Sequence, residues 1–192
     1  MLRSESAGGY PEGTTPTSWG EHVTDHGRDA GGRRMLGDLI AAGHLMSMEE
    51  LPGAVAERAA DAGFPEVLIY LGDLRGQVLR LVTGEGLSGA CHERELRVEG
   101  TVPGRSYQYG QVIAAAPDGS QWWLPLMDGT ERLGVLRVAS AHTDDRAGED
   151  AASLSGLVAL MIVTKRNGAP ADQKGRQPAG ASASSTQEAA DP

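Results

Sequence analysis

The sequence is short of several residue types, and each shortage excludes a class of protein. Only one cysteine, Cys91, occurs among 192 residues, so no disulfide can form within the chain. Basic residues number 17 against 26 acidic ones, which gives a formal net charge of -9. Proteins that follow nucleic-acid backbones need clustered Lys and Arg instead, so we do not expect nucleic acid as a partner.

Long hydrophobic runs are also missing. The longest unbroken aliphatic run covers residues 157 to 163, far fewer than the roughly 18 apolar residues that span a bilayer. No apolar stretch near the amino terminus has the form of a signal peptide. Together with the single cysteine, these features predict a cytoplasmic protein without a membrane segment.

Apolar side chains are scarce at both ends of the chain. Residues 1 to 33 are rich in Gly, Ser, Thr and Pro, and residues 167 to 192 contain no Leu, Ile, Val, Met or aromatic residue. Such segments cannot bury enough apolar surface to fold. We therefore expect one domain from 34 to 166 between two disordered tails.

The middle of the chain has the pattern of an α+β domain. Apolar residues recur at helical spacing over residues 36 to 43, and Ser47-Met48-Glu49-Glu50 has the form of a capping box that starts a second helix. Strands are expected at 67–71, 78–82, 96–98 and 112–116, a short helix between Thr101 and Gly110, and a last helix over 145–166. This order predicts a mainly antiparallel central sheet.

The stretch WWLPLMDGTERLGVLRV, residues 122 to 138, predicts a hairpin with two irregular positions. Asp128-Gly129 supplies the positive backbone angles of a tight turn. Pro125 lacks an amide donor and fits a sheet edge or a bulge, and Gly134 allows a packed element to come close to the strand.

Three stretches, LPLMDGTERLGVLRV, ELPGAVAERAADAGFPEVLIYLGD and EGTVPGRSYQYGQ, resemble the GAF sensor domain. The resemblance covers about residues 35 to 166 and is nearest to the GAF domains that precede SpoIIE-type serine/threonine phosphatases in actinobacteria. It implies a GAF-like α+β fold, with a central antiparallel sheet of about six strands and helices on both faces. The short helix covers the face on which family members hold small ligands. No phosphatase core follows in this sequence, so we expect a regulatory domain in signal transduction and not an enzyme.

Aromatic residues are few, and several fall on elements that border the pocket implied by the resemblance. A pocket lined by aromatic side chains and a few polar groups is typical of small-ligand sites, although core packing explains the same residues equally well. Trp122 and Trp123 face opposite sides of a strand, so at most one of them lines the pocket. The candidate ligand-binding residues are Tyr70, Arg105, Tyr107, Tyr109 and Trp123.

The last expected helix is apolar nearly all round, whereas a helix packed on one side of a sheet needs only one apolar stripe. Its other apolar residues therefore predict a second partner. We expect a homodimer formed by the first and last helices, with Leu36, Ile40, Leu160, Ile162 and Val163 at the interface. The alternative is a protein-interaction module that binds no small molecule and acts on a signalling phosphatase or kinase.

Two glycine- or cysteine-containing motifs have simpler explanations than a cofactor site. GEGLSG, residues 84 to 89, matches a dinucleotide fingerprint, but too few residues separate it from the next strand for a crossover helix. Cys91-His92 resembles the bilin attachment of some GAF relatives, but it lies early in the domain and the accompanying motifs are missing. We expect no cofactor.

Candidate metal ligands occur in two places. His22 and His26 lack the glutamate of the His-Glu-x-x-His motif. HTDDRAGED, residues 142 to 150, contains five ligand-type side chains, but acids at the start of a helix complement its dipole. We therefore expect no metal site, and a sulfoxide reductase built on the GAF fold would need more than one cysteine.

Overall fold

The structure is a computed structural model that describes residues 19 to 84 and 92 to 168. Its elements in chain order are α1 (Trp19–Gly43), α2 (Leu51–Asp61), β1 (Glu66–Gly72), β2 (Val78–Leu81), β3 (Glu95–Arg97), α3 (Val102–Tyr109), β4 (Ile113–Ala114), β5 (Gln121–Asp128), β6 (Glu131–Ala139) and α4 (Asp145–Gly168).

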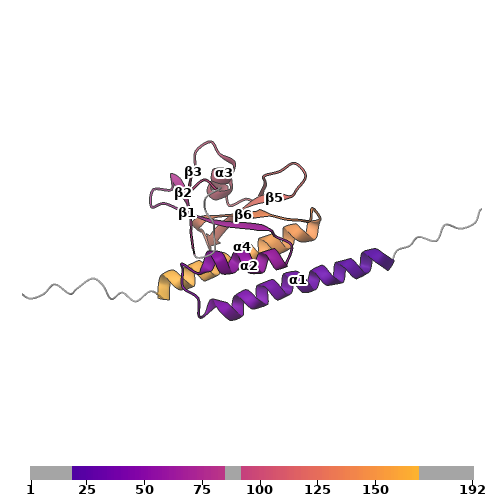
Figure 1. The fold of residues 1–192 in the computed structure, drawn as a ribbon. Coiled ribbons are helices and arrows are strands. Elements are labelled where there is room, and N and C mark those ends of the chain that lie inside the picture. The colour runs from indigo at the N-terminus through magenta and orange to yellow at the C-terminus, as the bar shows by residue number, and fades with distance from the viewer. Residues whose placement is uncertain (1–18, 85–91, 169–192) are drawn as a thin grey trace, which may run out of the picture.

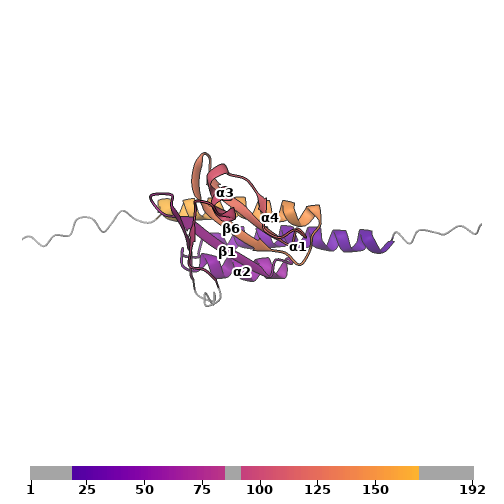
Figure 2. The same cartoon turned by 90° about the horizontal axis from the view of Figure 1, so that it is seen from above.

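The strands form one six-stranded sheet in the order β3-β2-β1-β6-β5-β4, and every neighbouring pair is antiparallel. Helices α1, α2 and α4 lie on one face of this sheet and α3 lies on the other (Figures 1 and 2). Each face carries its own buried apolar cluster. The predicted α+β fold, with an antiparallel sheet and helices on both faces, is confirmed.

Helices α1 and α4 lie side by side and run in the same direction (Figure 1). A Cβ added to Gly32 would lie 2.6 Å from the carboxylate of Asp150, and one added to Gly43 would lie 3.1 Å from Met161. The residue separation is 118 at both contacts (150 − 32 and 161 − 43), so the two helices keep one register. Part of the surface of α4 therefore meets α1 within the same chain. Ile162 is fully buried in the core of this chain, which corrects the expectation that it belongs to a dimer interface.

Helix α1 begins at Trp19, inside the segment 1 to 33 that the sequence predicts to be disordered. That prediction is wrong for residues 19 to 33. The prediction considered only whether the segment has enough apolar residues for a core of its own. In the structure, the helix packs against α4 at the buried residue Gly32. Its first turns project beyond the rest of the domain (Figures 1 and 2). The remaining parts of the two predicted tails, 1 to 18 and 169 to 192, lie outside the described residues.

The predicted capping box precedes α2. The amide of Ser47 donates to Glu50 Oε2 at 2.6 Å, and the amide of Glu50 donates to Ser47 Oγ at 3.2 Å. The backbone and side-chain hydrogen bonds from Ser47 lower the pKa of the Glu50 carboxyl. At its other end α2 stops before Gly63, whose φ of 94° is favoured by glycine.

Among the described helices, α4 is long and apolar enough to cross a membrane by length and composition alone. In its most apolar window, however, 44% of the residues are buried inside the domain, and a core helix passes the same test. The sheet and α1 cover part of this apolar surface, and Leu160 stays 62% exposed.

Candidate functional site

A second buried cluster lies between α3 and the sheet, and α3 is fixed closely above it. Thr101 Oγ1 accepts from the amide of Gly104, and Gly110 ends the helix in the left-handed conformation, as the sequence predicts. A Cβ on Gly104 would lie only 1.7 Å from the carbonyl oxygen of Val98. The absence of a side chain at Gly104 therefore lets α3 lie directly on the chain that leads into it.

The cluster contains three of the aromatic residues. The rings of Tyr70 and Trp123 are 5.8 Å apart at an interplanar angle of 58°, and Tyr107 of α3 packs against the same cluster. Trp122 packs against the helical core on the other face. The structure thus identifies Trp123 as the tryptophan on the α3 face, which the sequence left open.

Burial shapes the chemistry of Tyr70. Its hydroxyl donates to the carbonyl of Glu93 at 3.2 Å. Burial of the side chain is the main reason why the pKa of Tyr70 is raised above its ordinary value. The hydroxyl therefore stays protonated, and Tyr70 acts as a hydrogen-bond donor at neutral pH.

Polar and charged side chains line the cluster near the start of β1, and we call Glu66, His92 and Arg137 the polar rim. Arg137 Nη1 lies 3.0 Å from Glu66 Oε1, and His92 Nε2 lies 3.7 Å from Glu66 Oε2. The Arg137 guanidinium also lies over Trp123, with Cζ 5.9 Å from the ring centroid, within the range of a cation–π contact. Glu66 Oε1 is buried and lies in the ion pair with Arg137. The polar rim therefore places a paired carboxylate beside an aromatic wall.

Of the five predicted ligand-binding residues, the structure brings three together and separates two. Tyr70, Tyr107 and Trp123 meet between α3 and the sheet. Arg105 and Tyr109 lie on the outer side of α3, where Tyr109 is 67% exposed. Ligand binding by any of the five stays a prediction.

The sequence analysis missed Glu66 and Arg137 of the polar rim. Alternation along β1 was the available signal for Glu66, because it shares a face with Tyr70 in a strand of period two. No comparable signal exists for Arg137, since its place depends on the register of the β5–β6 hairpin.

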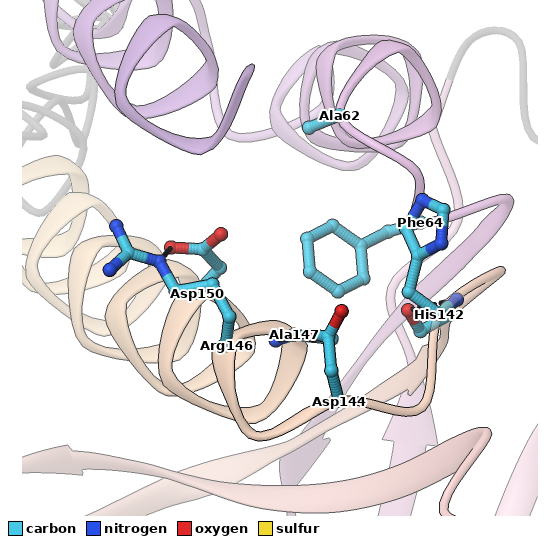
Figure 3. Close-up of a pocket in the computed structure, with 8 residues that line it drawn as sticks. Ala62, Phe64, His142, Asp144, Arg146, Ala147 and Asp150 are labelled. Atoms are coloured by element: carbon cyan, nitrogen blue, oxygen red, sulfur yellow. Dashed lines mark hydrogen bonds and ion pairs between the residues drawn. The ribbon is translucent and has the colours of Figure 1, made fainter. Parts of the chain in front are cut away.

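A small cavity lies on the helical face, between the end of α2 and the start of α4 (Figure 3). The Phe64 ring points into this space, with Asp144, Arg146 and Asp150 on the α4 side and His142 opposite. Its volume of about 20 Å³ exceeds the roughly 10 to 15 Å³ needed for one water molecule but not by enough for an organic ligand. This cavity is not a small-molecule site.

The motifs set aside in the sequence have mixed outcomes. Cys91 and nearly all of GEGLSG lie outside the described residues, as do the side chains of His22 and His26. Within the described residues, no three His, Cys, Asp or Glu side chains are grouped for a metal ion. In HTDDRAGED, Asp144 Oδ1 accepts from the amide of Ala147 at 2.9 Å, which agrees with a role at the start of α4.

Comparison with solved structures identifies the fold. The chain matches the GAF domain of an Acinetobacter phosphoenolpyruvate-protein phosphotransferase with a TM-score of 0.57 and 18% identity, over 71% of this chain and 95% of that one. The GAF domain of the Coxiella burnetii enzyme of the same name gives 0.59 and 15%, with the same coverage. Free methionine-R-sulfoxide reductase from Neisseria meningitidis, solved with its substrate, gives 0.52 and 20%, over 71% and 90%.

No protein-family model and no curated protein matches the sequence. The structural matches therefore establish the GAF fold, and the predicted resemblance is confirmed at that level. The narrower resemblance to phosphatase-linked GAF domains of actinobacteria stays a prediction.

Proposed function

We propose that this chain is a non-enzymatic, cytoplasmic GAF regulatory domain in signal transduction that forms a homodimer through α1 and α4 and binds a small ligand beneath α3. Solved structures with this fold include a region of a methyl-accepting chemotaxis protein, which supports a regulatory role. The single cysteine argues against chemistry of the sulfoxide reductase kind, and it suits a reducing compartment.

The observation that carries the dimer is apolar surface left over after α1 and α4 have packed together. Ile40 on α1 is 55% exposed and Leu160 on α4 is 62% exposed. Half-buried Leu36 and Val163 lie at the edge of the core on the same two helices. Because α1 and α4 run in one register, Ile40 and Leu160 lie at neighbouring levels of the pair. A second copy would cover both.

The ligand part of the proposal rests on the polar rim beside the aromatic pair. Trp123 is half-buried, and the Glu66 carboxylate lies nearby in its ion pair with Arg137. A small polar molecule with a planar or apolar part would place that part against Trp123 and an N–H or O–H group toward Glu66.

The dimer is tested by light scattering at micromolar concentration. We expect twice the chain mass for the wild-type protein, and Leu160→Glu is expected to weaken association at least tenfold because it places a charge in an apolar interface. Leu74→Glu is the matched control, since Leu74 is fully exposed in the β1–β2 turn and should leave the dimer intact. A monomeric wild-type protein, or equal effects of the two variants, would contradict the proposed dimer.

A second candidate function is the protein-interaction module, and the outer side of α3 favours it. Val102, Arg105 and Tyr109 follow at steps of three and four residues, so they share one helical face, and all three are exposed. Val112 beyond the helix is exposed as well. Tyrosine and arginine dominate the binding energy of many protein interfaces, so a signalling phosphatase or kinase would find its anchors here.

The two functions are separated by what copurifies with the natively expressed chain. If the small-ligand function holds, mass spectrometry of the purified protein finds a metabolite that is lost in Trp123→Ala and kept in Tyr109→Ala. If the interaction function holds, a stoichiometric protein partner is lost in Tyr109→Ala and kept in Trp123→Ala. A molecule retained equally by both variants would contradict both assignments.

A further inference from the structure

Two buried serines tie the helices of opposite faces to one strand. Ser106 of α3 is fully buried, and its Oγ lies 2.8 Å from the carbonyl oxygen of Gln111 and 3.3 Å from that of Trp123. Ser155 of α4 is also buried, and its Oγ donates to the carbonyl of Pro125 at 2.8 Å. Ser106 has one hydroxyl proton, which the Gln111 and Trp123 carbonyls share, with Trp123 the more distant acceptor. On β5 the carbonyls of Trp123 and Pro125 are two residues apart.

At this point β5 is paired with β6 on one side only. Strand β4 pairs with β5 only at Trp122 and Trp123, so β5 from Leu124 onward has no neighbouring strand on that side within the described chain. Pro125 has no amide to donate. A bulge interrupts the β5–β6 pairing between Leu126 and Met127, and bulges let a strand bend locally. The serine hydroxyls therefore replace part of the ladder that would otherwise fix β5.

We propose that Ser106 and Ser155 couple α3 to α4 through β5, so that a change beneath α3 alters the position of α4. This inference rests on the proposed function, in which the ligand lies beneath α3 and α4 carries the dimer interface. Trp123 contributes to both the proposed ligand site and the contact between α3 and β5. Its ring faces the α3 side of the sheet, and its carbonyl receives Ser106, so a ligand that moves Trp123 pulls on the strand that Ser155 holds.

Burial gives the coupling its strength. A buried hydroxyl or carbonyl that loses its partner costs more than a typical hydrogen bond contributes, because water cannot replace the partner. Displacement of β5 by about 1 Å would stretch a bond of this kind beyond hydrogen-bonding distance. Helix α4 then follows β5, since moving with the strand costs less than leaving Ser155 and the Pro125 carbonyl unpaired.

The test is a double-mutant cycle on the unliganded chain, with denaturant unfolding as the readout. Ser106→Ala and Ser155→Ala should each lower the equilibrium constant for folding. The effect of the double variant should differ from the product of the single effects by at least threefold, as is typical of coupled positions. Should alanine prevent folding, cysteine at the same positions keeps a similar shape with a weaker donor.

Ser140 supplies the matched control, because it is the third buried serine among the described residues and its Oγ accepts from the amide of His142 at 3.0 Å, within its own loop. In the cycle of Ser106→Ala and Ser140→Ala, the effect of the double variant on the folding equilibrium constant should equal the product of the two single effects to within about twofold, as for independent sites. A Ser106–Ser155 cycle that is equally multiplicative overturns the proposal.

Hydrogen exchange gives an independent readout. Ser106→Ala should speed amide exchange in α4 at least threefold around Ser155, and Ser155→Ala should do the same in α3, because coupling between two sites is reciprocal. Ser140→Ala should do neither. If amide exchange becomes faster only in the helix that carries the substitution, the proposed coupling is overturned. The dimer is measured separately by light scattering. The coupling can therefore be overturned while the dimer is confirmed, and the dimer can be contradicted while the coupling is confirmed.

Discussion

Gly134→Ala is expected to destabilise the domain by about 3 kcal/mol or more, at the upper end of what overpacking costs. Gly134 lies on β6 opposite Leu71 of β1, at the centre of the sheet. A Cβ built there would lie 1.9 Å from the carbonyl oxygen of Tyr70 and 2.9 Å from Leu71 Cα. Both obstacles are backbone atoms, so no side-chain rotation relieves the contact, and β1 and β6 must move apart.

Denaturant unfolding of Gly134→Ala beside Gly148→Ala measures this effect. A Cβ on Gly148, in α4, meets nothing within 4 Å, and replacing a helical glycine by alanine gains up to about 1 kcal/mol. Both variants replace a glycine by alanine. If the free energy of unfolding falls in Gly134→Ala and rises in Gly148→Ala, the loss is due to the close approach of the strands. A free energy of unfolding for Gly134→Ala within about 0.5 kcal/mol of the wild type would contradict the packing described.

Gly134 also illustrates what the sequence predicts well. A glycine inside a strand indicates close approach of another element, and the element proves to be the neighbouring strand β1. The Asp128-Gly129 turn, the capping box before α2 and the ends of α3 are likewise local signals, each decided by a few adjacent residues. Signals of this kind gave the order of elements and hence the fold.

The register of the hairpin is not a local signal, and the polar rim depends on it. Met127 pairs with Arg132, but Leu126 pairs with Gly134, so the bulge adds one residue to β6. It places Arg137 opposite Trp123, whereas an unbroken ladder would place Leu136 there. A shift by one residue turns every later side chain to the other face. Pro125 indicated a sheet edge or a bulge, but it did not fix which strand carries the extra residue, and so it did not fix the register.

The surroundings of α4 are a related case. Its all-round apolar surface correctly indicated a second partner, but the sequence could not tell whether that partner belongs to the same chain. Helix α1 lies beside α4 in the same chain, and on α4 Ile162 is buried in the core while Leu160 stays exposed. Composition misled because α1 meets α4 at a buried glycine, Gly32, which carries no apolar side chain that the sequence could show.

Lys165→Met is expected to destabilise the domain by about 2 kcal/mol, within the range for hydrogen bonds to a charged group. Lys165 Nζ, on α4, donates to the carbonyl of Gly43 at 2.9 Å and also to the carbonyl of Met46. Helix α1 has no basic residue in its last turn, although its final carbonyls need donors and favour positive charge. Lys165 supplies that charge from another helix, and methionine keeps the apolar stem but loses the ammonium.

Arg166→Met is the matched control, one residue along α4. Arg166 Nη1 lies 3.8 Å from Glu131 Oε1, and both side chains are more than half exposed. Loss of this surface ion pair should therefore lower the free energy of unfolding by less than about 1 kcal/mol. Lys165→Met should also speed amide exchange in the last turn of α1 and raise the pKa of Glu50, since Lys165 adds to the larger effect of Ser47 in lowering it. Arg166→Met should leave both unchanged. Equal free energies of unfolding for the two variants would show that the Lys165 ammonium does not hold α1 to α4. The pairing of these two helices would then depend on apolar packing alone.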